Sequence, residues 1–207
     1  MYSNEIVNKL LIASVVLSIA SPAFTETLTQ VERERAMSEL HATRKQFLDS
    51  VAGLFDAQWN FKPSPDIWSV AEVAEHIAIS EDMIFKAVTE RVMKTPATPE
   101  KKPEVHGKDE LVLEKTVDRS TKFQAPEMLR PTRRWPTEPA LTDHFKASRD
   151  RTIAYVENTQ DDLRDHFLEH PAFKLLDGYQ WILLISAHSH RHTLQIEEVK
   201  ANPNFPK

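Results

Sequence analysis

The stretch WSVAEVAEHI, residues 68–77, has the pattern of a helix start. Ser69 and Glu72 have the spacing of a capping box, in which each side chain bonds the backbone N–H of the other residue. Trp68 and Val73 stand where a hydrophobic staple fixes the entry of the chain into a helix. We therefore predict that a helix begins at Ser69, with one apolar face turned toward a core.

Three more segments share this helical periodicity. Apolar residues recur at three- and four-residue spacings in residues 28–55, and similar helices are expected at about 140–158 and 177–200. The helix at residue 69 should continue to about residue 93, because the prolines beyond it cannot occupy a helix interior. Seven of the 13 prolines fall between residues 95 and 139, where at most a short helix around 109–120 is expected.

Length and composition favour an all-α protein. The chain has 207 residues and only 3 glycines, which argues against a turn-rich sandwich or barrel. Four helices and one long connection indicate a four-helix bundle, and the connection is long enough to cross the bundle between helices 2 and 3. Because there is no cysteine, disulfides, thiolate ligands and a cysteine nucleophile are excluded, and any metal must bind nitrogen or oxygen.

The N-terminus resembles a cleaved secretory signal. Lys9 precedes an apolar run at residues 10–20, and Ser21-Pro22-Ala23 supplies small residues at the usual positions before a cleavage site. The run of about 11 residues is too short to cross a membrane, which needs roughly 20. The sequence predicts a signal peptide at residues 1–23, a bundle domain at residues 24–207, and an exported, periplasmic or secreted protein. A buried or interfacial N-terminal helix is the alternative.

Histidines are concentrated in the last predicted helix. His188 and His192 project within about 40° of each other on an apolar stripe, whereas His190 lies about 200° from His188 and should face outward. His76 lies on the apolar face of the helix that begins at Ser69. One histidine from this helix and two from the last would form a three-nitrogen site with an open coordination position. Such a site favours Zn²⁺ or Ni²⁺.

Simpler interpretations compete with each of these assignments. His76 could be a hydrogen-bonded core histidine, and two histidines four residues apart can arise by chance among 9 histidines. Glu72 is most simply a capping residue, with a supporting contact to His76 as the second interpretation. Gln195 is a candidate partner of the metal ligands or a filler of a polar layer. Arg191 is a candidate for holding a substrate anion, or it lies on a solvated flank of the helix. The remaining histidines share no spacing and receive no role.

These residues resemble a known family, the DinB-like (DinB/YfiT) superfamily. The resemblance rests on residues 58–63, on residues 68–77, on residues 177–181 and on the segment from His188 to Gln195, and it covers nearly the whole predicted domain. It implies a four-helix bundle with an up-down-down-up path. It also implies a metal triad at His76, His188 and His192.

The family includes metal-dependent hydrolases and transferases that use a low-molecular-weight thiol. The resemblance therefore implies a protein with a divalent metal that acts on a small electrophile, and the predicted signal peptide adds export, in which this chain departs from the thiol-dependent members. A non-catalytic metal- or ligand-binding bundle is the alternative. No general base is identified. The formal net charge of −5, from interspersed charges, argues against nucleic acid as a partner. We expect a small-molecule substrate and no stable membrane insertion after cleavage, and dimerisation through a helical face is left open.

Overall fold

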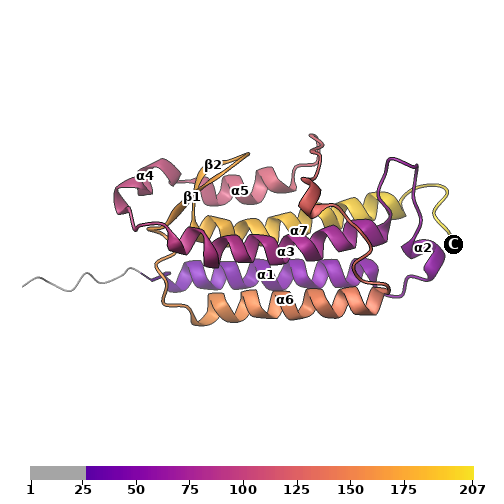
Figure 1. Cartoon of the computed structure of the whole chain (residues 1–207), viewed down its shortest axis with the longest axis horizontal. Helices are drawn as coiled ribbons and strands as arrows, with labels where there is room; N and C mark the ends of the chain where they lie inside the picture. Colours follow the sequence, from indigo (N-terminus) through magenta and orange to yellow (C-terminus); the bar gives the residue numbers. More distant parts are fainter. Residues whose placement is uncertain (1–26) are drawn as a thin grey trace, which may run out of the picture.

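The computed structural model describes residues 27–207 as a bundle of four long helices (Figure 1). Their bounds are Gln30–Val51 (α1), Val70–Glu90 (α3), Glu138–Asn158 (α6) and Gly178–Lys200 (α7). Figure 1 shows α1 and α7 running in one direction, and α3 and α6 in the other. This is the expected up-down-down-up path, with the long crossover between α3 and α6. The fold class is confirmed.

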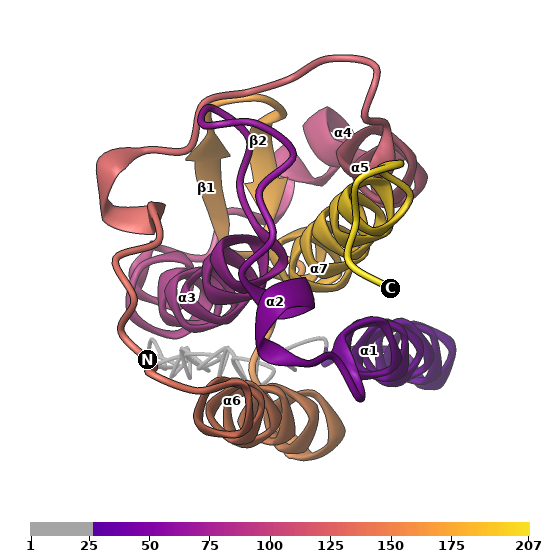
Figure 2. The same ribbon diagram turned by 90° about the vertical axis from the view of Figure 1, so that its right-hand side faces the viewer.

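Shorter elements lie outside the four long helices. The crossover contains α4 (Lys102–Val105) and α5 (Lys108–Val117), and α5 packs along α7 outside the bundle (Figure 2). One further turn, α2, spans Asp56–Trp59. The structure thus contains the predicted short helix in the crossover, and this helix packs against the outer side of α7. Short 3₁₀ turns occupy Val92–Lys94 (η1), Pro99–Lys101 (η2) and Glu127–Leu129 (η3).

A β-hairpin between α6 and α7 was not predicted. Strands β1 (Phe167–His170) and β2 (Lys174–Asp177) pair antiparallel, with Phe167 opposite Asp177 and His170 opposite Lys174. Each strand has four residues, too few for a clear alternating pattern. The predicted end of α3, at about residue 93, is also slightly too late. The helix ends at Glu90, and η1 forms the next turn.

Capping boxes fix where three of the long helices begin. In α3, the Ser69 hydroxyl accepts the backbone N–H of Glu72, and the Glu72 carboxylate accepts the N–H of Ser69 at 2.8 Å. The same reciprocal pair forms between Asp177 and Gln180 at the start of α7. These contacts satisfy backbone donors that have no partner within the helix. The predicted starts of α3 and α7 are confirmed. Each start determines which side chains farther along the helix face the core.

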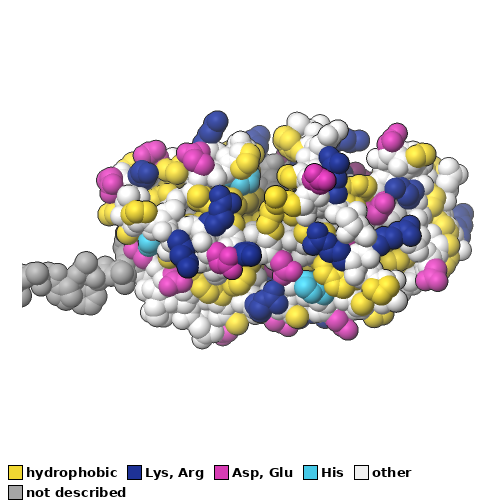
Figure 3. All heavy atoms as spheres, in the orientation of Figure 1, with side chains coloured by type: hydrophobic (Ala, Val, Ile, Leu, Met, Phe, Trp, Pro, Cys, Tyr) yellow, Lys and Arg dark blue, Asp and Glu magenta, His cyan; other side chains and the backbone are white. Residues whose placement is uncertain are grey.

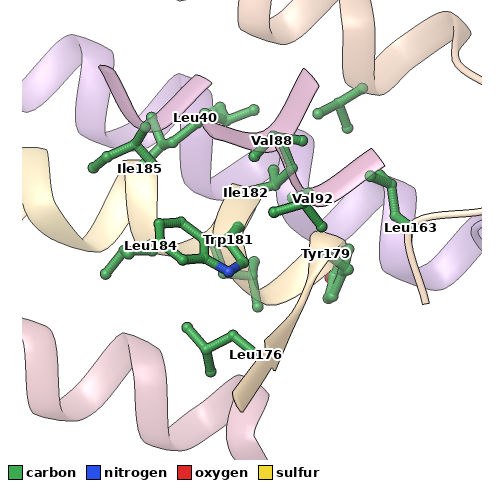
Figure 4. Close-up of a cluster of buried hydrophobic side chains, with 14 of the residues drawn as sticks. Leu40, Val88, Val92, Leu163, Leu176, Tyr179, Trp181, Ile182, Leu184 and Ile185 are labelled. Carbon is green, nitrogen blue, oxygen red and sulfur yellow. The ribbon is translucent and has the colours of Figure 1, made fainter. Parts of the chain in front are cut away.

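Two hydrophobic clusters are separated by a polar layer in the middle of the bundle. The first cluster lies toward the hairpin and contains Leu40, Ile84 and Ile185, with others shown in Figure 4. The second lies toward α2 and is built on Phe47 and Phe145, whose ring centroids are 4.5 Å apart. Buried polar side chains lie between them on every long helix: Thr43 on α1, Glu81 on α3, Arg149 on α6 and Ser189 on α7.

The surface mixes charges of both signs. Figure 3 shows basic and acidic side chains interspersed over one face of the molecule. Among residues 27–207, no helix combines the length and the apolar character that a membrane crossing requires. The predicted signal peptide, residues 1–23, lies outside the described residues.

Candidate metal centre

Three histidines from two helices converge inside the bundle. His76 comes from α3, and His188 and His192 come from successive turns of α7. One nitrogen of each ring lies within 4.8 Å of one nitrogen of both other rings. The ring centroids are 5.1 Å apart for His76 and His188, 4.4 Å for His76 and His192, and 4.5 Å for the pair on α7. The structure therefore brings together the three residues that the sequence singled out.

Burial keeps these imidazoles neutral. Removal from water lowers the pKa of His76, and it lowers the pKa of His192 to about 3, with His76 adding repulsion. The pKa of His188 lies well below its usual value for the same reason, reinforced by the other two rings. A neutral imidazole has a free lone pair, which is the form that binds a metal ion.

Hydrogen bonds orient two of the three rings. The Nδ1 atom of His76 lies 2.8 Å from the main-chain oxygen of Leu129, and Nδ1 of His192 lies 2.8 Å from Oε1 of Gln195. Because each partner is an oxygen acceptor, both Nδ1 atoms carry the proton and donate it. This tautomer leaves the Nε2 lone pair of each ring free for a ligand.

The third ring, His188, makes no hydrogen bond to any residue in the described range 27–207. It is held by packing, with His76 and His192 as ring neighbours. The Trp68 ring is a further neighbour of the cluster, with its centroid 5.1 Å from that of the His76 ring. Trp68 therefore packs against the centre from the same helix entry that caps α3.

Gln195 is itself held in place. Its Oε1 atom also accepts a 3.4 Å hydrogen bond from Arg119, whose guanidinium forms a two-pronged ion pair with Glu198. The supporting contact proposed for Gln195 is thus present in the structure. Arg119 and Leu129 were missed, because both lie in the irregular crossover where no periodicity predicts a neighbour.

Glu72 and Arg191 have other partners. Glu72 completes the capping box with Ser69 and pairs with Lys62 at 3.0 Å, so it caps the helix and does not contact His76. Arg191 is buried and donates to the main-chain oxygens of Thr116, Asp118 and Thr121. Its guanidinium fastens the end of α5 to α7 through three of its five N–H donors, and a role in holding a substrate anion stays a prediction. Helical angles alone could not distinguish this role from a solvated flank.

The remaining histidines lie outside the cluster. His144 pairs with Asp82 at 2.7 Å, His166 bonds the main-chain oxygen of Thr95, and His170 accepts two backbone N–H groups in the hairpin turn. His190, predicted to face outward, is partly exposed and does not join the three ligand atoms. His144, His166 and His170 thus each have a partner outside the three-histidine cluster.

The cluster fits a divalent metal ion. Tetrahedral bonds of about 2.0–2.1 Å to one ion would hold the three nitrogens about 3.4 Å apart. In the structure these nitrogens lie within 4.8 Å of one another, so a small inward rotation of the rings brings them to this spacing. All three donors are neutral imidazoles, and two have the outer hydrogen bond that metal-binding histidines almost always make.

Comparison with known proteins identifies the family of this chain. The sequence profile of the DinB superfamily matches residues 39–196. The chain belongs to the DinB superfamily. YuaE of Bacillus subtilis (strain 168), an uncharacterized protein, is 30% identical over 165 residues, which cover 79% of this chain and 96% of YuaE.

A solved structure shares the fold. YfiT from Bacillus subtilis superposes with a TM-score of 0.51 at 16% sequence identity, over 87% of this chain and 93% of YfiT. YfiT is described as a probable metal-dependent hydrolase with an unusual four-helix bundle topology. At this identity the similarity establishes the bundle of this DinB-superfamily chain, and the chemistry is a separate question.

Proposed function

We propose that this protein is a metal-dependent hydrolase that binds a divalent ion through His76, His188 and His192. The observation that carries the proposal is the convergence of three neutral imidazoles, two of them oriented by hydrogen bonds, within the bundle. Three protein ligands are the number found in catalytic zinc sites, which keep one coordination position open. The description of YfiT as a probable metal-dependent hydrolase supports the same class of reaction.

The donor set favours particular metals. The described ligand cluster contains only imidazole nitrogens, which suit Zn²⁺ and Ni²⁺ better than ions that prefer oxygen, such as Mg²⁺ or Ca²⁺. Three neutral ligands leave the charge of the ion uncompensated. The open position should therefore prefer an anionic ligand.

The residues of the chain have distinct tasks in this proposal. His76 and His192 present Nε2 to the ion while their Nδ1 atoms remain bound to Leu129 and Gln195. Trp68 packs against the ring of His76. A bound divalent ion supplies Lewis acidity, which lowers the pKa of a water ligand and polarises the bond of a small electrophilic substrate.

A low-molecular-weight thiol is a second ligand of the right chemistry. A thiol at the open position would be held as the thiolate, the nucleophilic form, and would make the protein a transferase. The predicted signal peptide at residues 1–23 counts against this alternative, because export would separate the protein from the cytosolic thiol pool. Export itself is tested by mass spectrometry of the protein recovered outside the cytoplasm. The mass should match a chain that begins at Phe24.

Metal retention and turnover test the proposal together. Purified protein should contain close to one equivalent of Zn²⁺ or Ni²⁺ by elemental analysis, and should hydrolyse at least one member of a panel of simple esters and amides only when metal is present. The panel includes thiol and electrophile pairs to detect transferase activity. Metal binding without turnover would overturn the enzyme assignment in favour of a metal-binding bundle.

Two histidine variants make the test specific. His188→Ala removes one of the three ligands and should abolish metal retention. His190→Ala lies on the same helix, outside the cluster, and serves as the matched control with wild-type metal content. Equal metal in both variants would show that the ligand assignment is wrong.

A further inference from the structure

A segment of the crossover lies over the candidate metal centre. We call residues 118–135 the strap; it follows α5 and includes η3 (Figure 2). At its beginning, the Arg191 guanidinium donates to the main-chain oxygens of Asp118 and Thr121, which ties the strap to α7. Farther along, Leu129 is buried and its oxygen bonds the His76 ring. The strap is therefore in direct contact with a predicted metal ligand.

One carboxylate holds the far end of the strap. Glu75 is 4% exposed, and its two oxygens accept the backbone N–H groups of Thr132 at 2.8 Å, Arg133 at 2.8 Å and Arg134 at 3.1 Å. Three consecutive amides that point at one anion form a compact anion-binding turn. Hydrogen bonds to an ionised group are stronger than those between neutral groups.

The backbone of the strap adopts an unfavourable conformation to make these bonds. Arg133 has a φ of 62°, in the left-handed region that residues other than glycine seldom occupy. This conformation is sterically unfavourable, and the contact with Glu75 has to offset its cost. Without the Glu75 carboxylate, nothing else in the described contacts gathers the three amides in this way.

Glu75 and His76 are consecutive residues of α3. One turn of the helix thus both holds the strap through Glu75 and presents a metal ligand through His76. The main-chain oxygen of Leu129, in the strap, accepts the hydrogen bond from Nδ1 of His76. Leu129 lies three residues before Thr132, the first residue whose amide bonds Glu75. These contacts form a closed loop in which the carboxylate fixes the strap, and the strap fixes the ring.

We propose that Glu75 is a positioning residue for the metal centre, acting through the strap on the orientation of His76. Glu75 does not belong to the described ligand cluster. It keeps the oxygen of Leu129 where His76 can donate to it, so that Nε2 points toward His188 and His192. This inference rests on the proposed metal binding, and it adds a residue outside the predicted site.

Cobalt binding to full-length variants tests the inference. Glu75→Gln removes the charge and turns an N–H₂ group toward amide donors, so we expect Co²⁺ to bind about 10- to 100-fold more weakly. The visible Co²⁺ spectrum should also change, since an altered ligand orientation changes the coordination geometry. Trypsin should cleave more readily after Arg133 and Arg134. Glu75→Asp keeps the charge and should bind with an intermediate affinity.

Glu72→Gln is the matched control. Glu72 lies one turn earlier on α3, and it contacts Ser69 and Lys62 but not the strap. Glutamine can keep the capping bond to the Ser69 N–H, so we expect the Co²⁺ affinity and spectrum of this variant to match those of the wild-type protein. If Glu75→Gln does not fold, the comparison is made with Glu75→Asp, which should bind at least about threefold more weakly than wild type.

The outcomes separate this inference from the proposed function. A wild-type protein that binds no Co²⁺, Zn²⁺ or Ni²⁺ would overturn the metal site itself. A wild-type protein that binds metal, together with a folded Glu75 variant of unchanged affinity and unchanged Co²⁺ spectrum, would overturn the role of Glu75 alone.

Discussion

Each imidazole of the candidate centre is held in a different way. A main-chain oxygen orients His76, the Gln195 side chain orients His192, and packing alone holds His188. The hydrogen bonds fix the tautomer of the first two rings, whereas the described contacts fix no tautomer for His188. All three share one electrostatic property, because burial disfavours their charged forms.

This property predicts a pH dependence of stability in the metal-free protein. The pKa of His192 is about 3 in the folded state and about 6.5 in the unfolded chain, so between these values the unfolded chain binds more protons. The free energy of unfolding should therefore fall as the pH is lowered from 6.5 toward 3. His192→Gln lacks this group and should show a shallower decline.

Urea unfolding of metal-free protein at a series of pH values measures this difference. Burial raises the pKa of Asp177 to about 6, which acts in the opposite direction, but Asp177 is present in both proteins and its contribution cancels in the comparison. Parallel pH profiles for wild type and His192→Gln would show that the ring is not buried as the structure has it.

Sequence reasoning located the ligands but not all of their supports. His188 and His192 share a helical face by spacing, and Gln195 follows on the same face, so periodicity alone predicts their proximity. Leu129 and Glu75 could not be found in this way. Leu129 contributes only its backbone, and Glu75 bonds a segment whose path no pattern in the sequence predicts.

At the scale of elements, the start of α3 determines the direction in which His76 points. The capping box at Ser69 and Glu72 fixes the first turn, and His76 lies two turns later. The sequence specified this start because capping is local chemistry among neighbouring residues. The hairpin at residues 167–177 was missed because its short strands are stabilised by pairing with each other.

Ser69→Ala should therefore destabilise the protein by about 1 kcal/mol, within a range of about 0.5–2 kcal/mol, through loss of the side-chain bond to the N–H of Glu72. Chemical denaturation gives this value. Ser38→Ala, at an exposed position inside α1, is the control and should change stability by less than about 0.5 kcal/mol. Equal effects of the two substitutions would mean that the cap does not stabilise α3.

At the scale of the whole molecule, Arg149 joins all four long helices. Its guanidinium donates to both oxygens of Glu81 on α3 at 2.7 Å, to Ser189 on α7, and to Leu40 and Thr43 on α1. These five bonds use all five N–H donors of the side chain, which is 0% exposed. Ser189 follows His188 directly, so the same layer ties the metal centre to the core.

Arg149→Met should lower the free energy of unfolding by about 3–5 kcal/mol, because it leaves the Glu81 carboxylate buried without its partner. The double variant Arg149→Met with Glu81→Leu removes both charges and should recover much of this loss. Lys45→Met, which breaks the exposed pair with Asp49, is the control and should cost less than about 1 kcal/mol. Urea denaturation of these proteins and of the single variant Glu81→Leu, five proteins with the wild type, gives the comparison. A double variant as unstable as the sum of its single substitutions would contradict the claim that the ion pair, rather than the volume of each side chain, governs this layer.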